Sequence, residues 1–80
     1  MPTVNQLLQT DDPYITRNSF DGGGNQIYQG KAVPGSATSA AVWAIRRFTW
    51  SGGNLTAIDW ANGRTVAENV WDNAASLSYS

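Results

Sequence analysis

Few side chains in this sequence could do chemistry, and the usual catalytic partners are missing. The chain has no His and no Cys, and Lys31 is its single lysine. A serine nucleophile needs a base beside it, and nothing in the sequence pairs a serine with Lys31. The absence of His also removes the commonest metal ligand. We therefore predict a protein that is not an enzyme, with no catalytic residues, no metal and no cofactor.

The carboxylates suggest one alternative, a sugar-binding site. They are Asp11, Asp12, Asp21, Asp59, Glu68 and Asp72. Asp59 precedes Trp60 and Asp72 follows Trp71, and a host-glycan-binding module would use these aromatic faces with their neighbouring carboxylates. Acid–base catalysis would need two carboxylates held in one cleft, which no spacing here indicates. The simpler interpretation is that both are hydrogen-bonded surface carboxylates.

Arg46-Arg47 is the one basic cluster, and it lies among aromatic residues. Single-stranded nucleic acids bind to such surfaces, where bases stack on aromatic rings in a basic groove. The net charge of −1 argues against this, and arginines beside tryptophans often form cation–π or ion pairs instead. We predict no nucleic-acid partner. We also predict no membrane partner, because no apolar stretch is long enough to span a bilayer and the N-terminus lacks a signal-peptide pattern.

The element that would position these residues is a β-hairpin over Ala41–Trp60. Its first arm, Ala41–Trp50, is rich in β-branched and aromatic residues, and its second arm, Asn54–Trp60, alternates. Ser51-Gly52-Gly53 supplies the positive φ angles that a tight turn needs. Trp43 and Ile45 lie on one face of the first arm, whereas Phe48 and Trp50 lie on the opposite face. Either a β-bulge near Arg46-Arg47 restores the register, or both faces of the sheet are covered. We favour the second alternative, because four tryptophans in so small a domain indicate contacts with a partner.

The remaining patterns complete a small β domain. Gln26–Val33 alternates like a strand, and Pro34-Gly35 is a turn signature. Asn62-Gly63 predicts a type I′ turn that returns at Thr65-Val66, Ala67–Ala75 has mild helical character, and Ser76–Ser80 could form an edge strand. The predicted fold class is mainly β: a small antiparallel sheet, sandwich or barrel-like domain over 27–80, with at most one short helix.

Residues 1–26 differ in composition and are predicted to form an extended N-terminal arm. Their apolar residues are sparse, and Gly22-Gly23-Gly24 reads as a hinge rather than a phosphate loop, because no GK[ST] follows. A frayed terminus is the plain alternative. We favour an arm whose spaced apolar residues, Leu7, Leu8, Tyr14, Ile15 and Phe20, contact a neighbouring subunit.

Size and composition favour association. The chain has 80 residues, and a single core of this size supplies only about 3–5 kcal/mol. Without cysteines no disulfide can add to this, so we infer contacts with copies of itself or with a larger body. The candidate contact residues, besides those of the arm, are Trp43, Phe48, Trp50, Trp60 and Trp71.

An ordered set of motifs resembles small virion proteins of tailed bacteriophages. It comprises YQGKAVPGSATSAAVWAI (Tyr28–Ile45), IDWANG (Ile58–Gly63), VWDN (Val70–Asn73) and SLSY (Ser76–Tyr79). The resemblance covers about residues 27–80. Ala44 and Ala74 depart from it, because the similar sequences carry a charged residue near the first position and an arginine near the second.

This resemblance implies a structural component of a virion, made in the host cytoplasm. The first expectation is a capsid decoration (cement) protein, a homotrimer that contacts the major capsid protein. A tail component, such as a fibre anchor or adaptor, is the second.

Overall fold

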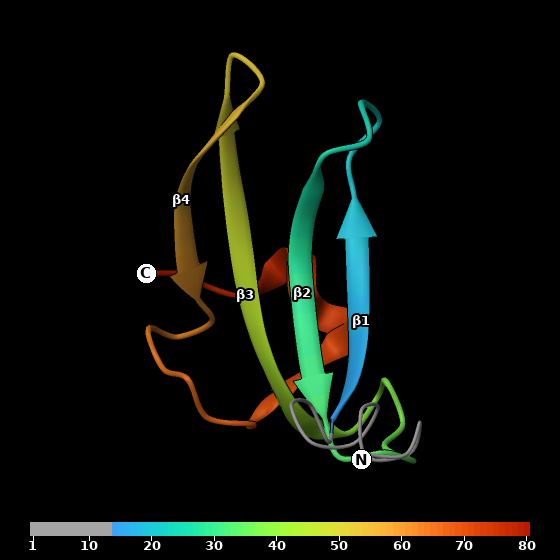
Figure 1. Ribbon diagram of the computed structural model, residues 1–80. Coiled ribbons are helices and arrows are strands. Elements are labelled where there is room, and N and C mark those ends of the chain that lie inside the picture. The colour runs from blue at the N-terminus through green and yellow to red at the C-terminus, as the bar shows by residue number, and fades with distance from the viewer. Residues whose placement is uncertain (1–13) are drawn as a thin grey trace, which may run out of the picture.

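The computed structural model describes residues 14–80, which form an antiparallel sheet with one short helix (Figure 1). The elements are the strands β1 (Ile15–Phe20), β2 (Gln26–Ala32), β3 (Ala41–Ser51), β4 (Asn54–Trp60) and β5 (Asn69–Val70), and the 3-10 helix η1 (Trp71–Ser76). The predicted mainly β, antiparallel fold is therefore confirmed. The predicted strands at Gln26–Val33 and in both arms of the hairpin match β2, β3 and β4 closely.

The four long strands follow one another in the order β1-β2-β3-β4, and β5 pairs with the start of β3. The register pairs Gly30 with Ile45 across β2 and β3, and Phe48 with Ile58 across β3 and β4. Figure 1 shows the sheet from one side, with η1 and the C-terminal segment behind it. One face of the sheet is thus covered by later parts of the chain.

Local sequence explains two of the turns. Gly52 and Gly53 both have positive φ, 58° and 84°, which is the backbone that a two-residue hairpin requires. The turn between β1 and β2 is built around Asp21, whose carboxylate accepts hydrogen bonds from the backbone N–H groups of Gly23 and Asn25 at 2.8 and 3.0 Å. The predicted hinge at Gly22-Gly23-Gly24 is therefore a hydrogen-bonded hairpin turn.

The sheet begins earlier than the sequence indicated. Ile15–Phe20, placed by the sequence in the extended arm, forms β1 and pairs along β2 from Ile15↔Ala32 to Phe20↔Gln26. Its residues are mostly polar because β1 is an edge strand with exposed side chains, so no apolar pattern marks it. Leu7 and Leu8, at the start of the predicted arm, lie outside the described residues.

The core lies between the sheet and the C-terminal segment. Within residues 14–80 its buried apolar residues are Ala32, Trp43, Ile45, Ala61 and Ala74, and of these only Trp43 and Ile45 are large side chains with full burial. We call residues 69–80 the C-terminal cover. Tyr79 holds it in place, because its hydroxyl donates to the carbonyl of Ala74 at 2.6 Å and its backbone forms a β-bridge with Ala61. The core that residues 14–80 form thus has few large side chains.

Gly30 lets two tryptophans pack onto the centre of β2. A Cβ at this position would lie 2.6 Å from the Trp71 ring and 3.1 Å from the Trp43 ring. The two rings contact each other, with centroids 6.0 Å apart. Gly30 is thus required here by close packing on its covered side.

The C-terminal predictions are corrected in part. Asn62 and Gly63 have positive φ, 58° and 67°, as a turn requires, but Thr65 and Val66 do not form a returning strand. The mild helical character of Ala67–Ala75 corresponds to β5 followed by η1. The edge strand predicted over Ser76–Ser80 is reduced to one bridge at Tyr79.

Candidate functional site

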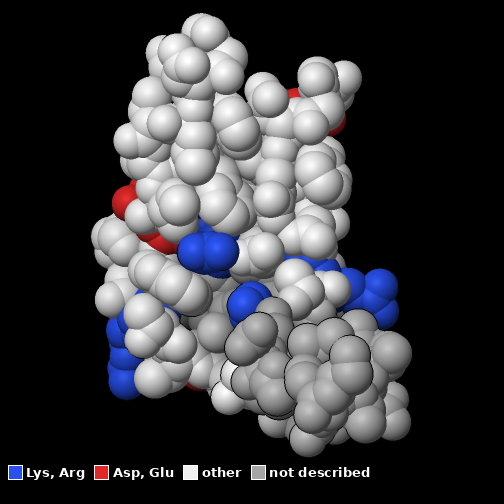
Figure 2. Space-filling view, viewed as in Figure 1, with Lys and Arg blue, Asp and Glu red and all other residues white. Residues whose placement is uncertain are grey.

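The face of the sheet opposite the C-terminal cover is the candidate site, and we call it the open face. Side chains alternate along a strand and paired residues share a face, so the register defines its members. They are Thr16, Asn18, Gln29, Lys31, Ala44, Arg46, Phe48, Ile58 and Trp60. None of these is a carboxylate. Figure 2 shows blue basic side chains near the middle of this face, and red acidic atoms only at its margins.

Arg46 is the centre of the open face. Its Nε donates to Oε1 of Gln29 at 2.8 Å, and its guanidinium lies 5.2 Å from the Phe48 ring centroid and 5.7 Å from that of Trp60. Arginine stacked on two rings is held in place, which leaves its terminal nitrogens able to bind a planar anion such as a carboxylate. No carboxylate within residues 14–80 forms an ion pair with Arg46.

Two hollows adjoin Trp60, and Arg46 lines the first of them. The first, of about 140 Å³, is lined by Gln29, Lys31, Ala44, Arg46 and Trp60. The second, of about 380 Å³, shares Lys31, Ala44 and Trp60 with the first and extends to Tyr14 and Val42. Because Trp60 lines both, they form one shallow depression that runs towards the point where β1 begins.

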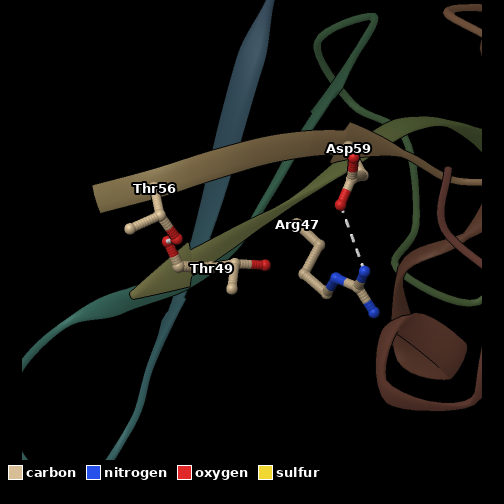
Figure 3. Close-up of polar contacts among 4 residues, drawn as sticks. All are labelled: Arg47, Thr49, Thr56 and Asp59. Atoms are coloured by element: carbon tan, nitrogen blue, oxygen red, sulfur yellow. Dashed lines mark hydrogen bonds and ion pairs between the residues drawn. The ribbon is translucent and has the colours of Figure 1, made fainter. Parts of the chain in front are cut away.

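Arg47 points to the opposite side of the sheet from Arg46. Its Nη2 forms an ion pair with Oδ2 of Asp59 at 3.1 Å (Figure 3), and its guanidinium lies 5.2 Å from the Tyr79 ring centroid. Alternation along β3 separates the two arginines, so they do not form a joint basic groove. The same alternation places Asp59 and Trp60 on opposite faces, which removes Trp60/Asp59 as a glycan site.

The register irregularity in the hairpin lies beyond Arg46-Arg47. The shift occurs between Thr49 and Trp50, where Thr56 is the extra residue of β4. Its hydroxyl donates to the carbonyl of Thr49 at 3.1 Å (Figure 3). The alternative of a β-bulge near Arg46-Arg47 is therefore wrong in position, because β3 alternates regularly through both arginines. The favoured interpretation, that both faces of the sheet are covered, stays a prediction for the open face.

Tyr79 has an unusual titration. Burial raises the pKa of its phenol to about 12, neighbouring Tyr28 adds to the rise, and Arg47 opposes it. The two tyrosine rings have centroids 5.5 Å apart. The group therefore stays neutral at physiological pH and serves the C-terminal cover, not a proton-transfer step.

The predicted contact residues within residues 14–80 divide into exposed or open-face residues, residues of the core, and Trp50. Phe48 and Trp60 lie on the open face, and Tyr14 and Phe20 are exposed by 53% and 59%. Trp43 is fully buried, so it cannot contact a partner, and Ile15 and Trp71 are half-buried against the core. The Trp50 indole donates to the carbonyl of Gln26 at 2.6 Å, which ties β3 to the start of β2.

Arg46 and Gln29 were not among the candidate contacts, although they organise the open face. Arg46 was considered only together with Arg47, as a nucleic-acid site. The strand alternation within Ala41–Trp50 could have separated the two arginines, whereas no sequence signal indicated that Gln29 would lie beside Arg46.

Trp71 and Asp72 remain together. They line a hollow of about 380 Å³ with Tyr28, Asn18, Ser19, Ala74 and Ala75. An aromatic ring beside a carboxylate, an amide and a hydroxyl is a composition that suits a sugar.

Over residues 14–80, no cluster of acidic side chains could hold a metal ion, and no helix in that range is long and apolar enough to cross a membrane. Comparison of the chain with protein-family models, curated proteins and solved structures gives no match.

Proposed function

We propose that this chain is a non-enzymatic structural subunit of a tailed-phage virion that works by association through its open face. The first candidate role is a capsid decoration (cement) protein that binds copies of itself and the major capsid protein. A tail fibre anchor or adaptor is the second. The virion assignment is supported by the sequence resemblance, and the mode of action by the structure.

One observation carries the proposal: large apolar side chains lie on the face that no described element covers. Ile58 is 43% exposed, and beside it are Phe48 and Trp60. Covering such a group stabilises a complex by roughly 25 cal/mol per Å² of apolar surface. Aromatic residues and arginine are also the side chains most enriched at protein interfaces.

The free edges of the sheet provide a second type of contact. β1 has no neighbour on its outer side within residues 14–80, and β4 has only the short contact of its end with Tyr79. Unpaired edge strands are templates for pairing with another chain. Both contacts are of the kind that a small assembly subunit uses.

The test compares two substitutions of matched exposure. Ile58→Glu places a charge on the open face, whereas Val66→Glu places it at a residue of similar exposure, 44%, in the loop after β4. We expect light scattering to show oligomers for the natural chain and Val66→Glu, and a dissociation constant at least tenfold higher for Ile58→Glu. A chain that is monomeric at every concentration, or equal effects of both substitutions, would contradict the proposal.

A glycan-binding module is the second candidate function, and the hollow at Trp71 and Asp72 favours it. Binding of a neutral sugar there should quench tryptophan fluorescence, and Asp72→Asn should weaken that response. No response of the natural chain to a panel of host glycans would eliminate this candidate.

A further inference from the structure

We propose that Arg46 makes the open face a binding site for a carboxylate, and that its occupant is an acidic side chain of a different protein, flanked there by apolar residues. The inference rests on the proposed function, because it names the chemistry of a partner that the open face would bind. The apolar residues around Arg46 cannot select this partner alone, since apolar attraction is non-directional.

The guanidinium of Arg46 is held in place before any ligand arrives. Its Nε donates to Oε1 of Gln29 at 2.8 Å, and the ring centroids of Phe48 and Trp60 lie 5.2 and 5.7 Å from it. Phe48 is two residues further along β3, and Trp60 is the cross-strand partner of Arg46, so both rings come from the same hairpin. A guanidinium that is already ordered loses little conformational freedom when it binds.

The terminal nitrogens of Arg46 bond to no acceptor within the described part of the chain. Arg47 and Arg64 differ, because each forms an ion pair with a carboxylate, at 3.1 and 3.4 Å. Arg46 is only partly exposed, and a partly buried charge without a counter-ion is unfavourable. A carboxylate from outside would supply that counter-ion, and its two oxygens match two N–H groups of the guanidinium.

The surroundings of Arg46 suit a carboxylate that is attached to apolar carbon atoms. The hollow of about 140 Å³ beside it is lined in part by Ala44 and Trp60. An apolar cavity of about 150 Å³ holds a benzene ring, so this hollow has room for the carboxylate and the carbons that carry it. Phe48 and Ile58 extend the apolar surface of the open face. A phosphate would fit less well, because it brings up to about two negative charges to one guanidinium.

A second copy of this chain is a poor source of the carboxylate. In the described part of the chain, Asp59 and Glu68 are in ion pairs, and Asp21 accepts two backbone hydrogen bonds in the turn between β1 and β2. Asp72 lies in η1, behind the sheet (Figure 1), so a copy could use it only by packing its back onto the open face. We therefore assign the carboxylate to a different protein.

The test uses the full chain and two short peptides that differ in one charge. Acetyl-Leu-Glu-Leu-amide carries the carboxylate, and acetyl-Leu-Gln-Leu-amide is its neutral counterpart. NMR follows binding through the indole N–H signal of Trp60 and, in the natural chain, the Nε–H signal of Arg46. Salt at about 0.15 M screens unspecific attraction between exposed charges.

Two substitutions of the same type test the role of the guanidinium. Arg46→Lys keeps the positive charge but removes the planar fork. Arg17→Lys is the matched control, because Arg17 is exposed and its partner in β2 is Gly30, whose Cβ position faces the covered side.

We expect the glutamate peptide to shift both signals, and the glutamine peptide to bind at least fivefold more weakly. Arg46→Lys should weaken binding of the glutamate peptide at least fivefold, whereas Arg17→Lys should leave it unchanged. Equal binding of the two peptides to the natural chain would overturn the proposal. So would equal effects of the two substitutions, which would indicate an unspecific response to charge.

Light scattering separates this inference from the proposed function. We expect Arg46→Lys to associate with itself as the natural chain does. If Arg46→Lys and Asp72→Asn both weaken self-association, the carboxylate belongs to a second copy and the assignment to a different protein falls. If the two peptides bind equally while Ile58→Glu still prevents association, the inference falls and the proposed function stands. If the glutamate peptide binds selectively but the natural chain is monomeric at every concentration, the carboxylate site stands and self-association through the open face falls.

Discussion

Replacing Gly30 by alanine tests the packing at the centre of the sheet. Alanine is normally favoured over glycine within a strand by about 0.5–1 kcal/mol, because glycine loses more backbone entropy on folding. Here the new Cβ would lie 2.6 and 2.9 Å from two carbons of the Trp71 ring, closer than carbon atoms can approach. Overpacking of this kind costs about 1–3 kcal/mol, so the clash should exceed the entropic gain.

We therefore expect Gly30→Ala to lower the free energy of unfolding by about 1–2 kcal/mol, which for a domain of this size lowers Tm by roughly 5–15 °C. Urea denaturation followed by tryptophan fluorescence measures the change. Gly22→Ala is the matched control, because a Cβ there would meet nothing within 4 Å, and its stability should be unchanged or slightly higher.

A second substitution, at Trp71, tests whether contact with this ring causes the destabilisation. In a Trp71→Leu background, the ring that opposes the new Cβ is gone, so Gly30→Ala should cost much less than it does in the natural chain. This coupling between the two substitutions is what a direct contact produces. A Gly30→Ala protein at least as stable as the natural chain would refute the argument from packing.

The remaining predictions concern the C-terminal cover and the turn beside it. Because the folded Tyr79 has a pKa of about 12, above its ordinary value of 10.0, the unfolded chain loses this proton first and stability should fall as pH rises from about 10 to 12. For a partly exposed group we expect a loss on the order of 1 kcal/mol, absent in Tyr79→Phe. Asn62 has positive φ and donates from Nδ2 to Oδ1 of the buried Asn69 at 2.9 Å. Asn62→Gly should cost about 1 kcal/mol for the lost hydrogen bond, and Asn62→Ala about 1–2 kcal/mol more for backbone strain.

Each of these has a clear contrary outcome. Parallel stability curves for the natural chain and Tyr79→Phe between pH 10 and 12 would show that the phenol does not couple to folding. Equal stabilities of the glycine and alanine variants at Asn62, measured by urea denaturation, would show that the left-handed backbone there is not strained.

The sequence predicted the elements whose residues alternate and whose turns contain glycine or proline. β2, β3 and β4 were predicted with nearly correct bounds for this reason. β1 was missed because Thr16, Asn18 and Ser19 give an exposed edge strand no apolar pattern. β1 is recognised only by its pairing with β2 across the turn at Asp21, which its own polar residues do not indicate.

The candidate site was predicted less well than the fold. Phe48 and Trp60 were named as contacts, and the structure places both on the open face. Trp43 was also named, yet it is fully buried, because the number of tryptophans says nothing about which face each one occupies. The neighbours Asp59 and Trp60 seemed to form one site, but strand alternation sends them to opposite sides.

The meander topology also has a kinetic consequence. The connections between the four long strands have five, eight and two residues, and the one between β3 and β4 consists of Gly52 and Gly53 alone. Each hairpin can therefore close with a small loss of chain entropy. The pairing of β5 with β3 joins Ala41 to Val70, which is a far longer loop. The sheet should consequently form rapidly, and the C-terminal cover should pack over Trp43 and Ile45 in a later step. Substitutions in the cover should slow this later step.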